Sequence, residues 1–180
     1  MVSQQIILLI INVLGGIAVI GSYIIVLRKA GPNAANAMWG GVPSTIRPVY
    51  SVSMLIAALG YIAFLYLTVF KLVPAEVNIA GGLGYSLFYA VFMLILIPSA
   101  LWMPLTNAYI GHPGTALWVG IRTVLAIVGL ASIALIWALL ALKTQSSGIA
   151  YWLAVAGSGY FAFHTAVLDA LVWAALFHRQ

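Results

Sequence analysis

The chain contains five long runs of apolar residues, and these runs restrict it to a membrane protein built of helices. They cover residues 4–27, 47–71, 79–105, 115–142 and 148–177. A helix needs about 20 apolar residues to cross the hydrocarbon core of a bilayer, and each run is long enough. Charged residues make up only 5% of the chain, whereas a soluble domain carries about 25%. We therefore predict a single all-α domain over residues 1–180, an integral membrane bundle of five transmembrane helices.

The basic residues between the runs predict how the bundle is oriented. Four lie on the side of the first loop, the third loop and the C-terminus: Arg28, Lys29, Arg47 and Arg179. Two lie on the other side: Lys71 and Lys143. Because cytoplasmic loops carry an excess of Lys and Arg, we expect a cytoplasmic C-terminus and an N-terminus outside. Such flanking charges also explain the net charge of +5, so nucleic acid is not expected as a partner.

Several kinds of chemistry are excluded or lack a motif. The chain has no cysteine, which excludes disulfides and thiolate-bound metals. No phosphate-binding loop, zinc-binding helix motif or pair of carboxylates is visible, and no Ser/His/Asp signature is recognisable. The sequence therefore favours a binding or structural protein over an enzyme. His164 is the only histidine inside an apolar run; it excludes bis-histidine haem within one subunit but leaves a single axial ligand to haem or chlorophyll open.

Two charged residues lie well inside apolar runs. Asp169 is the only carboxylate in any run, and Arg122 is the only guanidinium far from a run's end. A charge at the centre of a membrane helix costs roughly 2.5–3.5 kcal/mol, so such residues usually have partners or a function. Both residues lie roughly 10–12 Å from the same membrane face by helical rise. We expect Arg122 and Asp169 to form an ion pair, and both a structural lock and a functional site remain open.

Polar and aromatic residues gather at one end of the predicted bundle, beneath the long first loop (residues 28–46). This group comprises Trp39, Arg47, Tyr50, Trp102, His112, Arg122 and Asp169. The opposite end is expected to hold no comparable concentration, so the group predicts a binding site. Pro98 and Pro104 are expected to kink or end their helix nearby and leave room for a ligand. The alternative is an ordinary aromatic belt at the membrane interface.

The last apolar run predicts a closely packed helix. Small residues recur at every fourth position: Ala150, Ala154, Ser158, Ala162, Ala166, Ala170 and Ala174. Such a row lets helix backbones approach closely in a membrane. With 3.6 residues per turn, Thr165, Asp169 and Trp173 share the packed face. His164 then falls on the far side, where it is expected to meet another helix or another subunit.

Three stretches resemble the translocator protein family (TspO/MBR), also called tryptophan-rich sensory proteins or peripheral benzodiazepine receptors. Residues 48–52 (Pro-Val-Tyr-Ser-Val) resemble the family's Gly-Pro-Val-Trp-Thr segment. Residues 100–105 (Ala-Leu-Trp-Met-Pro-Leu) resemble its Asn-x-x-Trp-x-Pro-Leu stretch. Residues 165–169 (Thr-Ala-Val-Leu-Asp), with Trp173, resemble its Ala-Thr-Ala-Leu-Asn-x-x-x-Trp run. The five helices and the long first loop agree with the family along the whole chain.

The resemblance implies a pocket under the first loop that binds porphyrin, haem or a sterol-like lipid, often in a homodimer. The predicted ligand-binding residues are Trp39, Tyr50, Trp102, Asn107, Arg122, Thr165 and Asp169. The chain also departs from the family. Tyr50 replaces its tryptophan and Asp169 its asparagine, residues 39–43 lack the Trp-x-Pro-Pro pattern, and no tyrosine follows Tyr160 to form the C-terminal cholesterol-type motif. A carboxylate at position 169 would prefer a cationic ligand or an arginine of the same chain.

Three functions stay open after this reasoning. The first is a membrane receptor for a flat apolar ligand, with membrane lipid around it. The second is an accessory subunit of a larger membrane complex, in which His164 contacts a partner or binds a pigment or haem. The third is a small proton-coupled transporter that uses Asp169 as the proton carrier.

Overall fold

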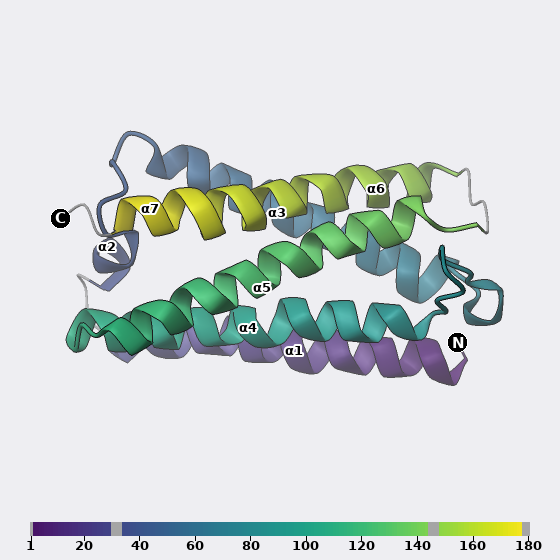
Figure 1. The fold of residues 1–180 in the computed structure, drawn as a ribbon, viewed down its shortest axis with the longest axis horizontal. Coiled ribbons are helices and arrows are strands. Elements are labelled where there is room, and N and C mark those ends of the chain that lie inside the picture. Colours follow the sequence, from purple (N-terminus) through teal and green to yellow (C-terminus); the bar gives the residue numbers. More distant parts are fainter. Residues whose placement is uncertain (1, 30–33, 144–147, 178–180) are drawn as a thin grey trace.

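The computed structural model describes residues 2–29, 34–143 and 148–177, and in this part the chain is an all-α bundle (Figure 1). Five helices are long and apolar enough to cross a membrane: α1 (Ser3–Lys29), α3 (Arg47–Tyr66) with its extension η1 (Leu67–Lys71), α4 (Ser86–Gly111), α5 (Thr115–Leu140), and α6 (Ile149–Ala162) with η3 (Phe163–Trp173) and α7 (Ala174–Phe177). The short helix α2 (Ala34–Trp39) and a 3₁₀ turn, η2 (Pro74–Glu76), lie in the connections. The fold confirms the prediction of a five-helix, multi-pass membrane protein.

The third span differs most from its predicted bounds. Residues 79–85 form a turn instead of the start of a helix, because Gly81 and Gly82 adopt φ angles of 82° and 80°, a region that L side chains rarely enter. An isolated bridge between Ile79 and Leu83 closes this turn.

Of the two effects expected of the prolines, a kink or an end of the helix, the second does not occur, since α4 runs through Pro98 and Pro104 to Gly111. Two hydroxyls bond to the backbone close to the prolines. The Ser99 Oγ donates to the Ile95 carbonyl at 2.6 Å, and the Thr106 Oγ1 donates to the Trp102 carbonyl at 2.8 Å. Membrane helices commonly tolerate proline with the help of such hydroxyls.

The helices are arranged in two layers with α5 crossing between them (Figure 1). One layer consists of α1 and α4, which lie side by side, and the other consists of α3 and α6. α5 packs against α4 in the first layer and against α6 and η3 in the second. The segment around α2 lies at the end where the chain finishes, and there the Gly41 N–H donates to the Phe177 carbonyl at 3.4 Å. The first loop therefore covers the end of the last span.

Small residues let the helices approach closely. A Cβ added at Gly60 of α3 would lie 2.5 Å from the backbone oxygen of Gly157 in α6. A Cβ added at Gly129 of α5 would lie 2.9 Å from the Cα of Ala166 in η3. Four members of the predicted row of small residues are buried: Ala154, Ser158, Ala162 and Ala174. The row thus takes part in close packing, as membrane helices without a hydrophobic driving force require.

Two large apolar clusters fill the bundle, one in each half, and a small third one joins Val26, Met38 and Met103. The Phe64 cluster lies in the half that contains the N-terminus and includes Leu8, Phe64, Tyr85, Phe88, Phe92 and Leu135. The Trp173 cluster lies in the half under the first loop and includes Val42, Tyr50, Ile121, Leu125, Trp173 and Phe177. The expectation that the opposite end has little comparable polar or aromatic concentration is wrong for the aromatic residues, because Phe64, Tyr85, Phe88 and Phe92 gather there. Helical periodicity gives the spacing along one helix, but it does not show which rings from different helices will meet.

Candidate functional site

The site begins with an unusual stretch of helix in the last span. Residues Phe163–Trp173 (η3) form a π-helix, in which each N–H bonds to the carbonyl five residues earlier. Residues five apart therefore lie near one another on the same face. This brings the His164 Nε2 within 3.6 Å of the Asp169 Oδ2. A regular α-helix would place His164 on the far side of the span, so that expectation is wrong for this reason.

His164 also contacts the neighbouring helix α3. Its Nδ1 lies 2.8 Å from the Ser53 Oγ, and the same oxygen accepts a hydrogen bond from the Tyr160 hydroxyl at 3.1 Å. Ser53 and His164 are both buried. The structure thus contains a continuous chain of polar side chains, Tyr160–Ser53–His164–Asp169, across two membrane spans. Of the two partners expected for His164, another helix is confirmed.

Asp169 stands at the accessible end of this polar chain. Its side chain is 32% exposed, whereas that of His164 is 7% exposed. The hydroxyl groups of Tyr23 in α1 and Tyr50 in α3 lie near Asp169. The Tyr50 hydroxyl donates to the Leu168 carbonyl at 2.7 Å, and its ring meets the Trp39 ring edge-on with centroids 5.9 Å apart. Aromatic residues from two spans, α1 and α3, therefore lie near the carboxylate.

Trp102 and Trp173 form the second part of the aromatic surroundings. Their ring centroids lie 5.4 Å apart in an edge-to-face arrangement, and Tyr23 packs against Trp102 at 5.8 Å. The Trp173 Nε1 donates to the Met38 carbonyl at 3.1 Å. The Trp102 Nε1 is also buried, but it has no hydrogen-bond partner among the residues that the structure describes. Buried donors are nearly always paired, so this one requires an explanation.

Tyr23 is the residue that the sequence analysis missed. It is the only tyrosine, and the only aromatic residue, in the first apolar run, and that ring was the signal that could have identified it. The pairing of α1 with α4 brings Tyr23 beside Trp102. Nothing in the spacing of residues within α1 reveals that pairing, so the omission has a structural cause.

Arg122 does not belong to this arrangement. The expected ion pair with Asp169 is wrong: the carboxylate pairs with His164, and Arg122 is exposed on the outer face of α5. Ile121 and Leu125 are the residues of that segment that enter the Trp173 cluster. The sequence predicted that Arg122 and Asp169 lie at the same depth in the membrane. The rotation of α5 about its axis decides whether Arg122 faces inward, and the depth of a residue does not determine that rotation.

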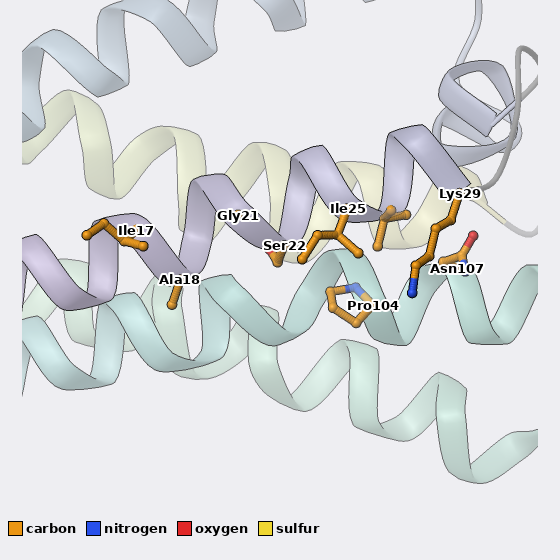
Figure 2. Close-up of a pocket in the computed structure, with 9 residues that line it drawn as sticks. Ile17, Ala18, Gly21, Ser22, Ile25, Lys29, Pro104 and Asn107 are labelled. Atoms are coloured by element: carbon orange, nitrogen blue, oxygen red, sulfur yellow. The ribbon is translucent and has the colours of Figure 1, made fainter.

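Two other predicted ligand residues have different surroundings. The Thr165 Oγ1 lies 3.0 Å from the Ser132 Oγ and 2.9 Å from the Phe161 carbonyl, so it links η3 to α5. Asn107 lines a groove between α1 and α4 (Figure 2). Among the predicted residues, Tyr50 lies near both Trp39 and Asp169. Trp102 packs against Trp173 and Tyr23.

Within the described ranges, no three His, Cys, Asp or Glu side chains gather in a way that could hold a metal ion. His164 has both ring nitrogens occupied, so an axial bond to haem would have to replace its contact with Ser53 or Asp169. A comparison of the chain with protein-family models, curated proteins and solved structures found no match. Function is therefore inferred from the side chains that gather around Asp169 and Trp102.

Proposed function

We propose that the protein is a membrane receptor that binds a flat apolar small molecule between the first loop and the aromatic end of the bundle. The observation that carries this proposal is the buried Nε1 of Trp102, which has no hydrogen-bond partner in the described part of the chain. A donor left without a partner in an apolar interior costs roughly 1–3 kcal/mol, and an acceptor atom on a ligand would remove that cost. The resemblance to the translocator protein family agrees with a ligand at this end.

The surrounding groups restrict the chemistry of the ligand. The rings of Tyr23 and Trp102 are only partly buried, so they offer faces and edges on which a planar molecule can stack. The ligand needs an acceptor for the Trp102 N–H and a donor or positive group for the Asp169 carboxylate. A tetrapyrrole carries pyrrole N–H donors and carboxylate acceptors on a flat ring, whereas a sterol has one hydroxyl. We therefore favour a tetrapyrrole over a sterol-like ligand.

A fluorescence titration with protoporphyrin or haem tests this function. We expect saturable quenching of tryptophan fluorescence at micromolar ligand. Trp102→Phe keeps an aromatic ring but removes the N–H, so it should weaken binding about fivefold, which corresponds to about 1 kcal/mol for one hydrogen bond. Trp152→Phe is the matched control, because Trp152 is 60% exposed in α6 near the opposite end of the bundle.

A linear response that does not saturate would contradict the proposal, because it indicates partitioning into detergent. The same conclusion would follow if Trp102→Phe and Trp152→Phe left the dissociation constant equally unchanged. A sterol competing with the porphyrin would show that both ligand classes use this site, whereas binding of the sterol alone would overturn the preference for a tetrapyrrole.

A second candidate function is proton transfer through the membrane, and the polar chain Tyr160–Ser53–His164–Asp169 is the observation that favours it. The hydroxyl groups of Tyr160 and Ser53 and the His164 imidazole are joined by hydrogen bonds. The Asp169 carboxylate lies 3.6 Å from the imidazole, so a small approach of the two groups would complete a path for a proton. Vesicles containing the protein and a pH-sensitive dye should then acidify faster than empty vesicles under an imposed potential. Asp169→Asn should reduce the rate to that of empty vesicles, whereas Glu76→Gln should not. Equal rates for the wild type and Asp169→Asn would exclude this function.

The orientation of the bundle is part of the proposal. Arg28, Lys29 and Arg47 lie at the end that carries the first loop, and Lys71 and Lys143 lie at the other. The remaining basic residue of that prediction, Arg179, lies outside the described residues. We propose that the first loop and the C-terminus face the cytoplasm. A reporter fused after Gln180 should be active only in its cytoplasmic form, and activity on the other side would reverse the orientation.

A further inference from the structure

A groove runs along the outside of the bundle between α1 and α4, separate from the aromatic residues around Asp169. Its volume is 590 Å³, within the range of about 300–1,000 Å³ typical of small-molecule sites. Ile17, Ala18, Gly21 and Ile25 of α1 line its apolar length (Figure 2). Ile17 and Ile25 are exposed, so the groove opens toward the surroundings of the helices.

The two ends of the groove differ in chemistry. At the end toward the first loop, Lys29 of α1 and Asn107 of α4 line it beside Pro104, and the Lys29 side chain extends along the groove toward α4 (Figure 2). Neither Lys29 nor Asn107 has a side-chain hydrogen bond or ion pair with any residue that the structure describes. Arg28 adds a second positive charge to the same turn. The groove thus has an apolar part, which we call the stem (Ile17, Ala18, Gly21 and Ile25), and a basic end, which we call the mouth (Lys29 and Asn107).

The length of the stem agrees with one leaflet of a bilayer. From Ile17 to Lys29 the helical rise spans roughly 18 Å. Half of a hydrocarbon core is about 15 Å thick, since the whole core is about 30 Å. Lys29 is the last residue of α1, so its ammonium group lies where the headgroups of that leaflet begin. Basic pockets between membrane helices are known to hold the headgroups of anionic lipids.

We propose that this groove is a binding site for one anionic phospholipid. An acyl chain lies along Ile17, Gly21 and Ile25. The headgroup phosphate accepts hydrogen bonds from the Lys29 ammonium and the Asn107 amide, whose five N–H donors are not used within the described part of the chain. This site is independent of the receptor function proposed above, because it involves neither Trp102 nor Asp169.

Native mass spectrometry tests the site with phosphatidylglycerol and phosphatidylcholine of identical acyl chains. We expect the wild type to retain phosphatidylglycerol about fivefold more strongly than phosphatidylcholine. Lys29→Gln should abolish this preference. Lys71→Gln is the matched control, because Lys71 is exposed at the end of a different span, on the opposite side.

A second pair of variants tests the stem instead of the mouth. A Cβ at Gly21 would meet no atom within 4 Å, so Gly21→Leu fills the groove without a clash in the protein. It should reduce retention of both lipids. Gly16→Leu is the control, since the space beside Gly16 is equally open but Gly16 does not line the groove. Equal melting temperatures of the two variants would show that folding is unaffected.

Three results would overturn the site. One is equal retention of the two lipids by the wild type. Another is an equal loss in Lys29→Gln and Lys71→Gln, which would show general attraction to a basic surface. The third is retention that does not depend on the apolar part of the groove. Either an unchanged retention in Gly21→Leu or complete removal of the lipid by free glycerol phosphate would show this.

Discussion

The two halves of the bundle contain similar kinds of residue but differ in how their polar groups are satisfied. In the Phe64 cluster, the Tyr61 hydroxyl donates to the Asn12 Oδ1 and the Tyr85 hydroxyl donates to the Thr68 carbonyl at 2.8 Å. In the half under the first loop, the Trp102 Nε1 has no partner among the described residues and the Asp169 side chain is partly exposed. Aromatic rings alone therefore do not identify a site. Polar groups that the fold leaves unsatisfied distinguish the candidate site from a packed core.

The largest expected effect comes from removing a ring from the packed half. Phe64 is fully buried and its ring meets those of Tyr61, Phe92 and Phe161. Phe64→Ala should lower the free energy of unfolding by about 3–5 kcal/mol, because the cavity loses its dispersion contacts. Thermal unfolding in detergent measures this loss, and porphyrin affinity should stay the same at temperatures where the variant is folded.

Phe70→Ala is the control for that experiment, since Phe70 is 53% exposed. Its effect on the melting temperature should be small. If Phe64→Ala instead weakened porphyrin binding while leaving the melting temperature unchanged, the roles assigned to the two halves would be reversed.

The next effect compares two tryptophans of the loop half. Trp173→Phe and Trp102→Phe lose the same ring volume and one N–H each. The Met38 carbonyl loses its donor only in Trp173→Phe, whereas Trp102→Phe removes a donor that has no partner. Without ligand, Trp173→Phe should therefore be less stable than Trp102→Phe by about 2 kcal/mol. Equal losses in thermal unfolding would mean that the Trp102 N–H is satisfied, and the receptor proposal would lose its main support.

The smallest effect concerns coupling around Asp169. A double-mutant cycle with His164→Ala and Asp169→Ala should give an interaction energy of about 1 kcal/mol, because the two side chains are in contact. The cycle with Arg122→Ala and Asp169→Ala should be additive within about 0.5 kcal/mol. The free energies come from denaturant unfolding. Coupling of Asp169 to Arg122 instead of His164 would restore the original ion-pair prediction and refute the π-helical arrangement.

The sequence by itself determined the membrane class and the positions of the five spans. These follow from the number of consecutive apolar residues, because the free energy of transferring a helix into the bilayer is the sum of the contributions of its residues. It also identified Asp169 and most of the aromatic residues of the loop half, since a carboxylate in an apolar run is unusual in any fold. The start of the third span was missed, because the positive φ angles of Gly81 and Gly82 are a property of the folded turn.

The tertiary structure alone decided which of these residues meet. His164 meets Asp169 because residues 163–173 form a π-helix, in which residues five apart lie on the same face. A pattern based on 3.6 residues per turn does not predict this contact. Arg122 is excluded because α5 turns Ile121 toward the Trp173 cluster. Tyr23 enters because α1 pairs with α4. Each outcome depends on how one helix is rotated against another, and that rotation is set by side-chain packing between residues far apart in the chain.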